Sequence, residues 1–253
     1  IKSNSLKLIK KNFIFLILLI FPFKALSHTD HYKNINKIEM EILKDGKVIG
    51  YCNYEFFHKD KSLEVQNSTK FEVKIFGVKV FSISSNAVEK YENDQLIFFK
   101  SITKQNDKKK FVDLKYEKNK NNFLIHGSSN KGSASLNNVI GNWWNHKILE
   151  SDSQISPLSG SIKKQTVTFI AEEKIDLYGK EYLTHKFKLK SKDLNIPEDK
   201  KLDFDIWFEP KSNLIFHTIK DGIIKNGENS IDIKVKDGVG NETKMNSKVY
   251  WSN

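Results

Sequence analysis

Residues 38–57, IEMEILKDGKVIGYCNYEFF, contain two apolar runs on either side of the pair Asp45-Gly46. On the first run Ile38 and Met40 fall on one face of an extended chain, because successive side chains of a strand point to opposite faces. Asp-Gly is a preferred central pair of a two-residue hairpin turn, and the run from Tyr51 to Phe57 leads back. The stretch therefore predicts an antiparallel hairpin with one buried face.

The same period of two continues along the chain, and turn residues break it about every eight to twelve positions. Further strands are expected at 71–75, 78–83, 87–91, 96–104, 111–116, 123–126, 164–172, 182–190, 202–208, 214–220 and 231–251. Between residues 127 and 161 the alternation stops, and we expect a long connection with one helical turn.

The predicted fold class is therefore all-β and mainly antiparallel. A sheet of about ten or more twisted strands seldom stays flat, so we expect a strongly curved sheet that forms a half-barrel or barrel with a long central loop. A β-sandwich is the alternative.

The N-terminal end has the order of a secretory signal peptide. Four lysines in the first eleven residues precede the apolar run Phe13–Phe23, and Ala25-Leu26-Ser27 supplies small residues before a cut. A membrane-spanning helix needs about 20 apolar residues, so no transmembrane anchor is expected after cleavage. We expect a signal peptide over residues 1–27, a single antiparallel β domain over residues 28–253, and a periplasmic location.

The charge of the chain favours this interpretation over nucleic-acid binding. The formal charge is +11, and it falls to +6 once the five lysines of residues 1–27 are removed. No arginine is present, although the arginine fork is the usual reader of bases and phosphates. Cys52 is the single cysteine and cannot form an internal disulfide. We expect no nucleic-acid partner.

Two groups of residues could carry chemistry. His28 would be the new N-terminus, and its free amine and ring, with His31 or Asp30 nearby, could bind copper or nickel, or the terminus could simply be solvated. Asp203 and Asp205 share a strand face with Trp207, which suits glycan hydrolysis but is also the pattern of any half-solvated strand. Neither group amounts to a motif, so no cofactor or metal site is predicted.

The adjacent tryptophans Trp143 and Trp144 lie inside the long connection. Two large rings need a place to pack, so this pair is expected either to plug one end of the barrel or to form the lip of a ligand site.

Several short motifs carry a family resemblance. They are KDGKVIG at 44–50, FEVKIFG at 71–77, Glu89-x-Tyr91, NDQL at 93–96, Trp144-Asn145 and DIWF at 205–208. Over roughly residues 36–220 the chain resembles an uncharacterised family of exported β-sheet proteins from alphaproteobacteria, known only as a domain of unknown function. The strand pattern is also distantly similar to the curved sheets of periplasmic lipoprotein and lipid carriers, which is a likeness of fold alone.

Two functional hypotheses follow. The first is a non-enzymatic periplasmic protein that binds an apolar or amphipathic molecule of the cell envelope, such as a lipid, on a concave sheet face. The residues expected to line or close that site are Phe71, Val73, Ile75, Phe98, Trp144 and Trp207. The alternative is an exported metal- or carboxylate-dependent enzyme that acts on envelope glycans through His28 or the Asp203 and Asp205 pair. The oligomeric state is not predicted.

Overall fold

The structure is a computed structural model, and it describes residues 31–44, 47–177, 180–197, 200–219, 228–237 and 242–250. The expected signal peptide, His28 and the expected turn at Asp45-Gly46 lie outside these residues. No helix among the described residues is long and apolar enough to span a membrane.

The larger of two sheets has ten strands in the order β16-β15-β1-β2-β3-β4-β5-β6-β7-β8. Its strands are β1 (Ile35–Lys44), β2 (Lys47–Lys59), β3 (Ser62–Ile75), β4 (Val78–Glu92), β5 (Gln95–Gln105), β6 (Lys108–Glu117), β7 (Asn122–Gly127), β8 (Lys131–Ser135), β15 (Glu228–Asp237) and β16 (Glu242–Tyr250). Every neighbouring pair in this sheet is antiparallel.

The smaller sheet has six strands in the order β14-β13-β12-β11-β10-β9. Its strands are β9 (Val139–Ile140), β10 (Ser153–Ile155), β11 (Ile162–Leu177), β12 (Lys180–Ser191), β13 (Asp203–Glu209) and β14 (Leu214–Ile219). Only its β9–β10 pair is parallel among the described strands. A short 3-10 helix, η2 (His146–Leu149), lies between β9 and β10 in the chain.

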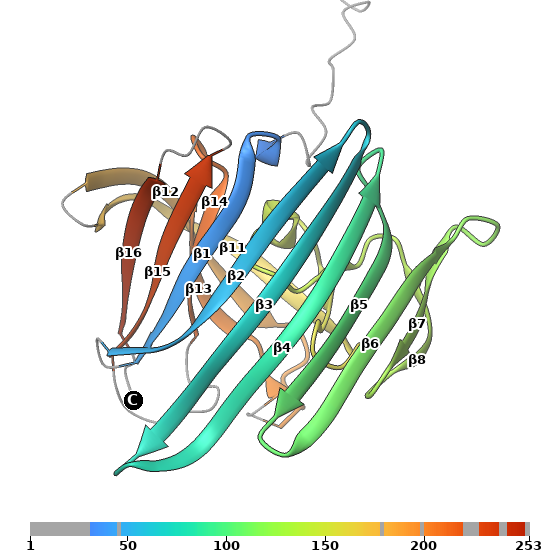
Figure 1. Cartoon of the computed structure of the whole chain (residues 1–253), viewed down its shortest axis with the longest axis horizontal. Helices are drawn as coiled ribbons and strands as arrows, with labels where there is room; N and C mark the ends of the chain where they lie inside the picture. The colour runs from blue at the N-terminus through green and yellow to red at the C-terminus, as the bar shows by residue number, and fades with distance from the viewer. Residues whose placement is uncertain are drawn as a thin grey trace, which may run out of the picture.

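Figure 1 shows the larger sheet as a curved wall with the smaller sheet behind it. The predicted fold class, an all-β and mainly antiparallel protein with a half-barrel shape, is confirmed. The opening hairpin is also present, since β1 and β2 pair from Lys37↔Glu55 to Lys44↔Lys47.

The core lies between the two sheets because alternate side chains of each strand point inward. On β2, Tyr54 and Phe56 are buried, whereas Phe57 is 50% exposed. The main apolar cluster joins such inward residues of the larger sheet to Tyr182 of β12 and Leu214 of β14. The two sheets therefore share one core.

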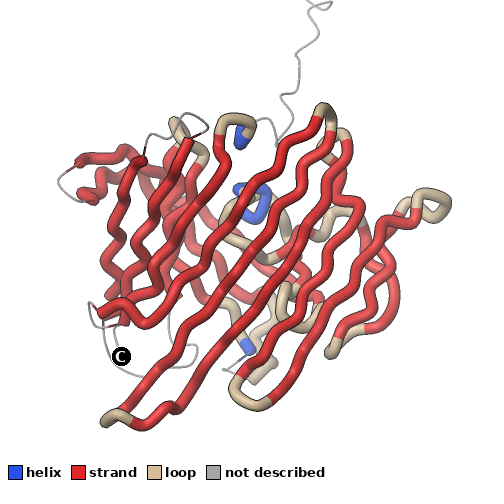
Figure 2. Tube along the Cα trace, viewed as in Figure 1, coloured by secondary structure: helices blue, strands red, loops and turns tan. Residues whose placement is uncertain are grey.

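Residues 137–161, which we call the plug, fill the space behind the larger sheet, where η2 is visible in Figure 2. Trp144 belongs to the main cluster, and Ile148 belongs to a second cluster with Leu189 of β12. Trp143 packs against both clusters. Tyr182 and Leu189 lie on opposite faces of β12, because seven positions separate them, so one face of the strand is buried near its beginning and the other near its end.

Some strand boundaries differ from the expectation. Residues 78–83 and 87–91 are parts of one strand, β4, and β3 begins at Ser62 instead of Phe71. The first residues of β3 alternate, with Leu63 and Val65 buried, but the middle of the strand has polar residues facing inward, which interrupts the apolar pattern. There Asn67 Nδ2 donates to the Asn53 carbonyl at 2.9 Å, and Thr69 Oγ1 donates to Cys52 Sγ at 3.1 Å.

The long connection contains more structure than expected. The expected helical turn is present as η2, but β8, β9 and β10 also lie between residues 127 and 161. The stretch expected as one strand at 231–251 forms two, β15 and β16.

Candidate binding site

One continuous apolar surface runs along the inner face of β3 and β4. The pairs Phe71↔Ile83, Val73↔Phe81 and Ile75↔Val78 lie directly opposite each other in the two strands and share a face. We call these six residues the apolar strip. Its inner part forms a separate buried cluster, bounded by Ile49 of β2 and Leu158 of the plug.

Burial decreases along the apolar strip towards the end of the hairpin. Val73 is 0% exposed and Phe81 7%, whereas Ile75 is 47% exposed and Val78 65%. The strip thus begins as core and ends as open apolar surface. The structure brings Phe71, Val73 and Ile75 together here, as three of the six residues expected to line a ligand site.

The outer part of the strip lies on a hairpin that projects beyond its neighbours. Pairing of β3 with β2 stops at Phe71, and pairing of β4 with β5 stops at Ile83. Residues 72–82, which we call the tip, therefore extend as a two-stranded hairpin, visible at the lower left of Figure 1.

Phe98 lies on the other side of the sheet. It precedes Phe99, which is 1% exposed and faces the core, and alternate strand residues point to opposite faces. Phe98 is half-buried opposite Lys90 and Lys115 of the neighbouring strands.

Trp144 is fully enclosed within the core, with 1% of its surface exposed. Its ring meets Tyr32, Phe56 and Tyr91 edge-on, with centroid distances of 4.9, 5.4 and 5.7 Å. Of the two roles expected for the tryptophan pair, the packing of Trp144 is that of a plug.

The plug holds its position through a buried carboxylate on β4. Glu89 is 2% exposed and accepts hydrogen bonds from Tyr91 Oη at 2.7 Å, Asn142 Nδ2 at 2.9 Å and Trp144 Nε1 at 3.1 Å. Burial raises the pKa of Glu89 to about 7, although its three hydrogen bonds act in the opposite direction. This carboxyl therefore titrates near neutral pH inside the core.

A second buried contact ties the plug to the N-terminal end of the described chain. The Tyr32 hydroxyl donates to the Asn213 carbonyl at 3.2 Å and accepts from the backbone N–H of His146 at 3.2 Å. Burial is the main cause that raises the pKa of Tyr32 well above its ordinary value, so the hydroxyl stays neutral. The contact links three segments that are far apart in sequence.

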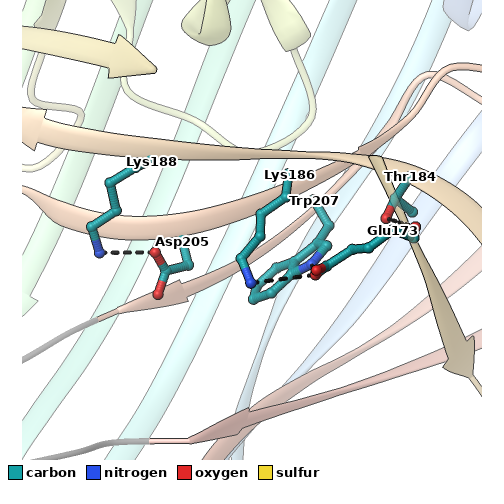
Figure 3. Close-up of polar contacts among 6 residues, drawn as sticks. All are labelled: Glu173, Thr184, Lys186, Lys188, Asp205 and Trp207. Atoms are coloured by element: carbon teal, nitrogen blue, oxygen red, sulfur yellow. Dashed lines mark hydrogen bonds and ion pairs between the residues drawn. The ribbon is translucent and has the colours of Figure 1, made fainter. Parts of the chain in front are cut away.

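Trp207 lies in a polar group on the smaller sheet, shown in Figure 3. Its Nε1 donates to the Glu173 carboxylate, and Lys186 Nζ lies 4.8 Å from its ring centroid and 3.3 Å from Glu173 Oε1. The ring is half-buried, and its partners hold it in place. It lies on a different sheet from the apolar strip.

Asp203 and Asp205 fall on the same face of β13 as Trp207, as expected from the alternation, and both pair with Lys188 of β12. The distance from Lys188 Nζ to Asp205 Oδ1 is 2.9 Å. Burial alone would lower the pKa of Lys188, but the two carboxylates outweigh it and the pKa is raised. The carboxylate pair is thus engaged in binding one ammonium group. Figure 3 shows the contact between Lys188 and Asp205.

The described residues contain no group of three or more His, Cys, Asp or Glu side chains that could hold a metal ion. His31 packs edge-on against His146, with ring centroids 5.2 Å apart. The copper-binding alternative depends on His28, which lies outside the described residues.

Fold and surface together define a half-barrel β protein with an open apolar strip at one end of its larger sheet. Residues 40–225 match the model of a family described as a domain of unknown function, DUF6134, and the chain belongs to this family. This confirms the resemblance expected from the short motifs. A crystal structure described as a beta-barrel-like protein of domain of unknown function DUF1849 from Brucella abortus is similar at 10% identity, covering 85% of this chain and 96% of that chain, with a TM-score of 0.49. No curated protein matches the chain.

Proposed function

We propose that the protein is an exported, non-enzymatic β protein that binds an apolar or amphipathic molecule of the cell envelope on the apolar strip. The observation that carries the proposal is the continuity of the strip, which passes from buried Val73 and Phe81 to Ile75 and Val78 at roughly half exposure or more. The larger sheet buries its inner face in the core but leaves the outer end of the apolar strip open to solvent. Continuous exposed apolar surface often marks a binding site.

The plug supports a site at the end of the half-barrel in preference to its centre. Trp144 and Ile155 fill the central space and are 1% and 0% exposed. Leu158, at the other end of the plug, packs against the inner part of the strip. An acyl chain that lay along Phe71, Ile75 and Val78 would continue the core outward, while its polar group could remain in water.

The variant Ile75→Asp tests the strip, because a charge there would have to be desolvated under a bound apolar ligand. With N-phenyl-1-naphthylamine as an apolar probe, we expect saturable fluorescence enhancement in the wild type and an affinity lower by about tenfold or more in the variant. Native mass spectrometry of protein purified without detergent is expected to show a lipid-sized adduct that Ile75→Asp lacks.

The matched control is Leu124→Asp. Leu124 is 45% exposed, close to the 47% of Ile75, but it lies next to buried Phe123 and Ile125 on the outer face of β7. Equal probe binding in both variants, or bare protein in every wild-type preparation, would contradict binding at the strip.

Export makes a separate prediction. When the chain is produced with its N-terminal segment in a Gram-negative host, protein recovered from the periplasm is expected to have the mass of residues 28–253, because Ala25-x-Ser27 fits signal peptidase. Replacing Ala25 and Ser27 by bulky residues should leave the segment attached. Recovery of the full-length mass from the cytoplasm alone would contradict export.

A further inference from the structure

We propose that the tip is a membrane-docking element, whose end inserts into the interfacial region of a bilayer that carries anionic headgroups. The proposal goes beyond ligand binding, since it concerns the bilayer surface and centres on Phe76 and Val80, which are not part of the apolar strip, although Val78 belongs to both. It rests on three observations at the same turn: its apolar exposure, its strained backbone and its charge.

The end of the tip exposes several apolar side chains. Phe76 is 102% exposed, and Val78 and Val80 are 65% and 47% exposed. Hairpin ends are normally polar because they face water. An apolar end on a projecting hairpin is instead suited to burial in the boundary between headgroups and acyl chains.

Phe76 also has an unfavourable backbone conformation. Its φ is 49° and that of Gly77 is 80°, so both central residues of the turn are left-handed. Every other described non-glycine residue with positive φ is Asn or Asp, the types that tolerate this region. Asn-Gly would suit the turn best. Phenylalanine here is therefore unfavourable because its backbone is strained and because its apolar ring is exposed to water. Phe76 is thus unfavourable for the stability of the fold both in its backbone conformation and in its exposure to water, which points to a role in contact with another molecule.

The charges next to the tip favour an anionic surface. Lys74 and Lys79 flank its end and share one acid, Glu72, at 3.1 and 3.9 Å. The neighbouring β5–β6 turn, which hydrogen-bonds to Ser82 through Asn106, contains one acid, Asp107, and is followed by Lys108, Lys109 and Lys110. Lysine side chains near an anionic membrane surface are attracted to it.

A second copy of the chain is a less suitable occupant. Stable protein interfaces involve about 20–30 residues on each side. The tip offers only residues 72–82, and like-charged lysines would meet across a pairing of two tips. A lipid surface needs no such area, because insertion of one aromatic and a few aliphatic side chains already contributes to binding.

The first test compares wild type with Phe76→Asn in the full chain, using vesicles of phosphatidylcholine mixed with phosphatidylglycerol. We expect binding to fall about tenfold in the variant, while its thermal midpoint stays the same or rises because the turn is relieved. Binding by the wild type should weaken as salt is added, and it should be weaker on vesicles of phosphatidylcholine alone.

The second test reports on the turn itself, independently of any other segment that contacts lipid. The emission of the new tryptophan in Phe76→Trp is the fluorescence of the variant minus that of the wild type. On binding to vesicles, this emission is expected to shift to the blue relative to the variant in buffer. Vesicles with brominated acyl chains are expected to quench it. The control Asn93→Trp places the same ring at the β4–β5 turn, at the opposite end of β4, and should show neither change.

Three results would overturn the proposal. One is unaltered vesicle binding by Phe76→Asn together with unquenched emission from Phe76→Trp. Another is equal binding to neutral and anionic vesicles. The third is a concentration-dependent dimer that Phe76→Asn abolishes, without any quenching by lipid. The Phe76 variants keep Ile75, so their vesicle readouts do not depend on probe binding at the apolar strip, and ligand binding and membrane docking can fail separately.

Discussion

Trp144→Ala is expected to lower the free energy of unfolding by about 4 kcal/mol. The side chain is 1% exposed and is surrounded by three aromatic rings at 4.9 to 5.7 Å, so its removal leaves a cavity that rigid neighbours cannot close. It also removes one of the three hydrogen-bond donors of buried Glu89. Urea denaturation monitored by circular dichroism measures the change.

Phe57→Ala is the control for this loss. Phe57 lies on β2 beside Phe56, which contacts Trp144, but it faces outward and is 50% exposed. Its truncation should change stability by about 0.5 kcal/mol at most. If Trp144→Ala were as mild as Phe57→Ala, the plug would not be an integral part of the core.

The opening hairpin and the fold class could be predicted because both depend on local patterns. Ile38 and Met40 alternate with glutamates, and burial of one face follows directly from that alternation. The middle of β3 could not be found in this way. Asn67 and Thr69 face inward there, where they hydrogen-bond to β2, so the pattern resembles a loop when the partner strand is unknown.

The candidate site was only partly predictable for a similar reason. Phe71, Val73 and Ile75 share a face through a period of two, whereas Trp144 and Trp207 were placed elsewhere by contacts with Glu89 and Glu173, tens of residues away. Such long-range partners leave no local trace in one sequence. The apolar turn at Phe76-Gly77 can be recognised from the local sequence, since an aromatic residue stands before a glycine between two strands.

The position of Glu89 can also be recognised from the local sequence, because Glu89 alternates with Ala87 and Tyr91, whose side chains face the core on β4. An acid at a core position is costly unless it is hydrogen-bonded or protonated. In this protein both conditions apply, since three donors surround the carboxyl and its pKa is about 7. The stability of the fold should therefore depend on pH.

Between about pH 4.5 and 7, the wild type is expected to lose about 3 kcal/mol of stability at this site as the pH rises. The unfolded chain releases the proton near the ordinary pKa of 4.5, whereas the folded protein holds it until about 7. The folded state therefore binds the proton more tightly, and its advantage is complete at low pH and lost above 7.

Glu89→Gln isolates this effect, because every other titrating group is common to the two proteins. Glutamine keeps an acceptor for Asn142 and Trp144 but cannot ionise, so it resembles the protonated acid. Urea titrations across the range should show similar stability at about pH 5 and a variant more stable by about 2 to 3 kcal/mol at about pH 8. Parallel pH profiles would mean that Glu89 is already ionised in the folded core, with the hydrogen bonds from Tyr91, Asn142 and Trp144 sufficient to hold its charge there.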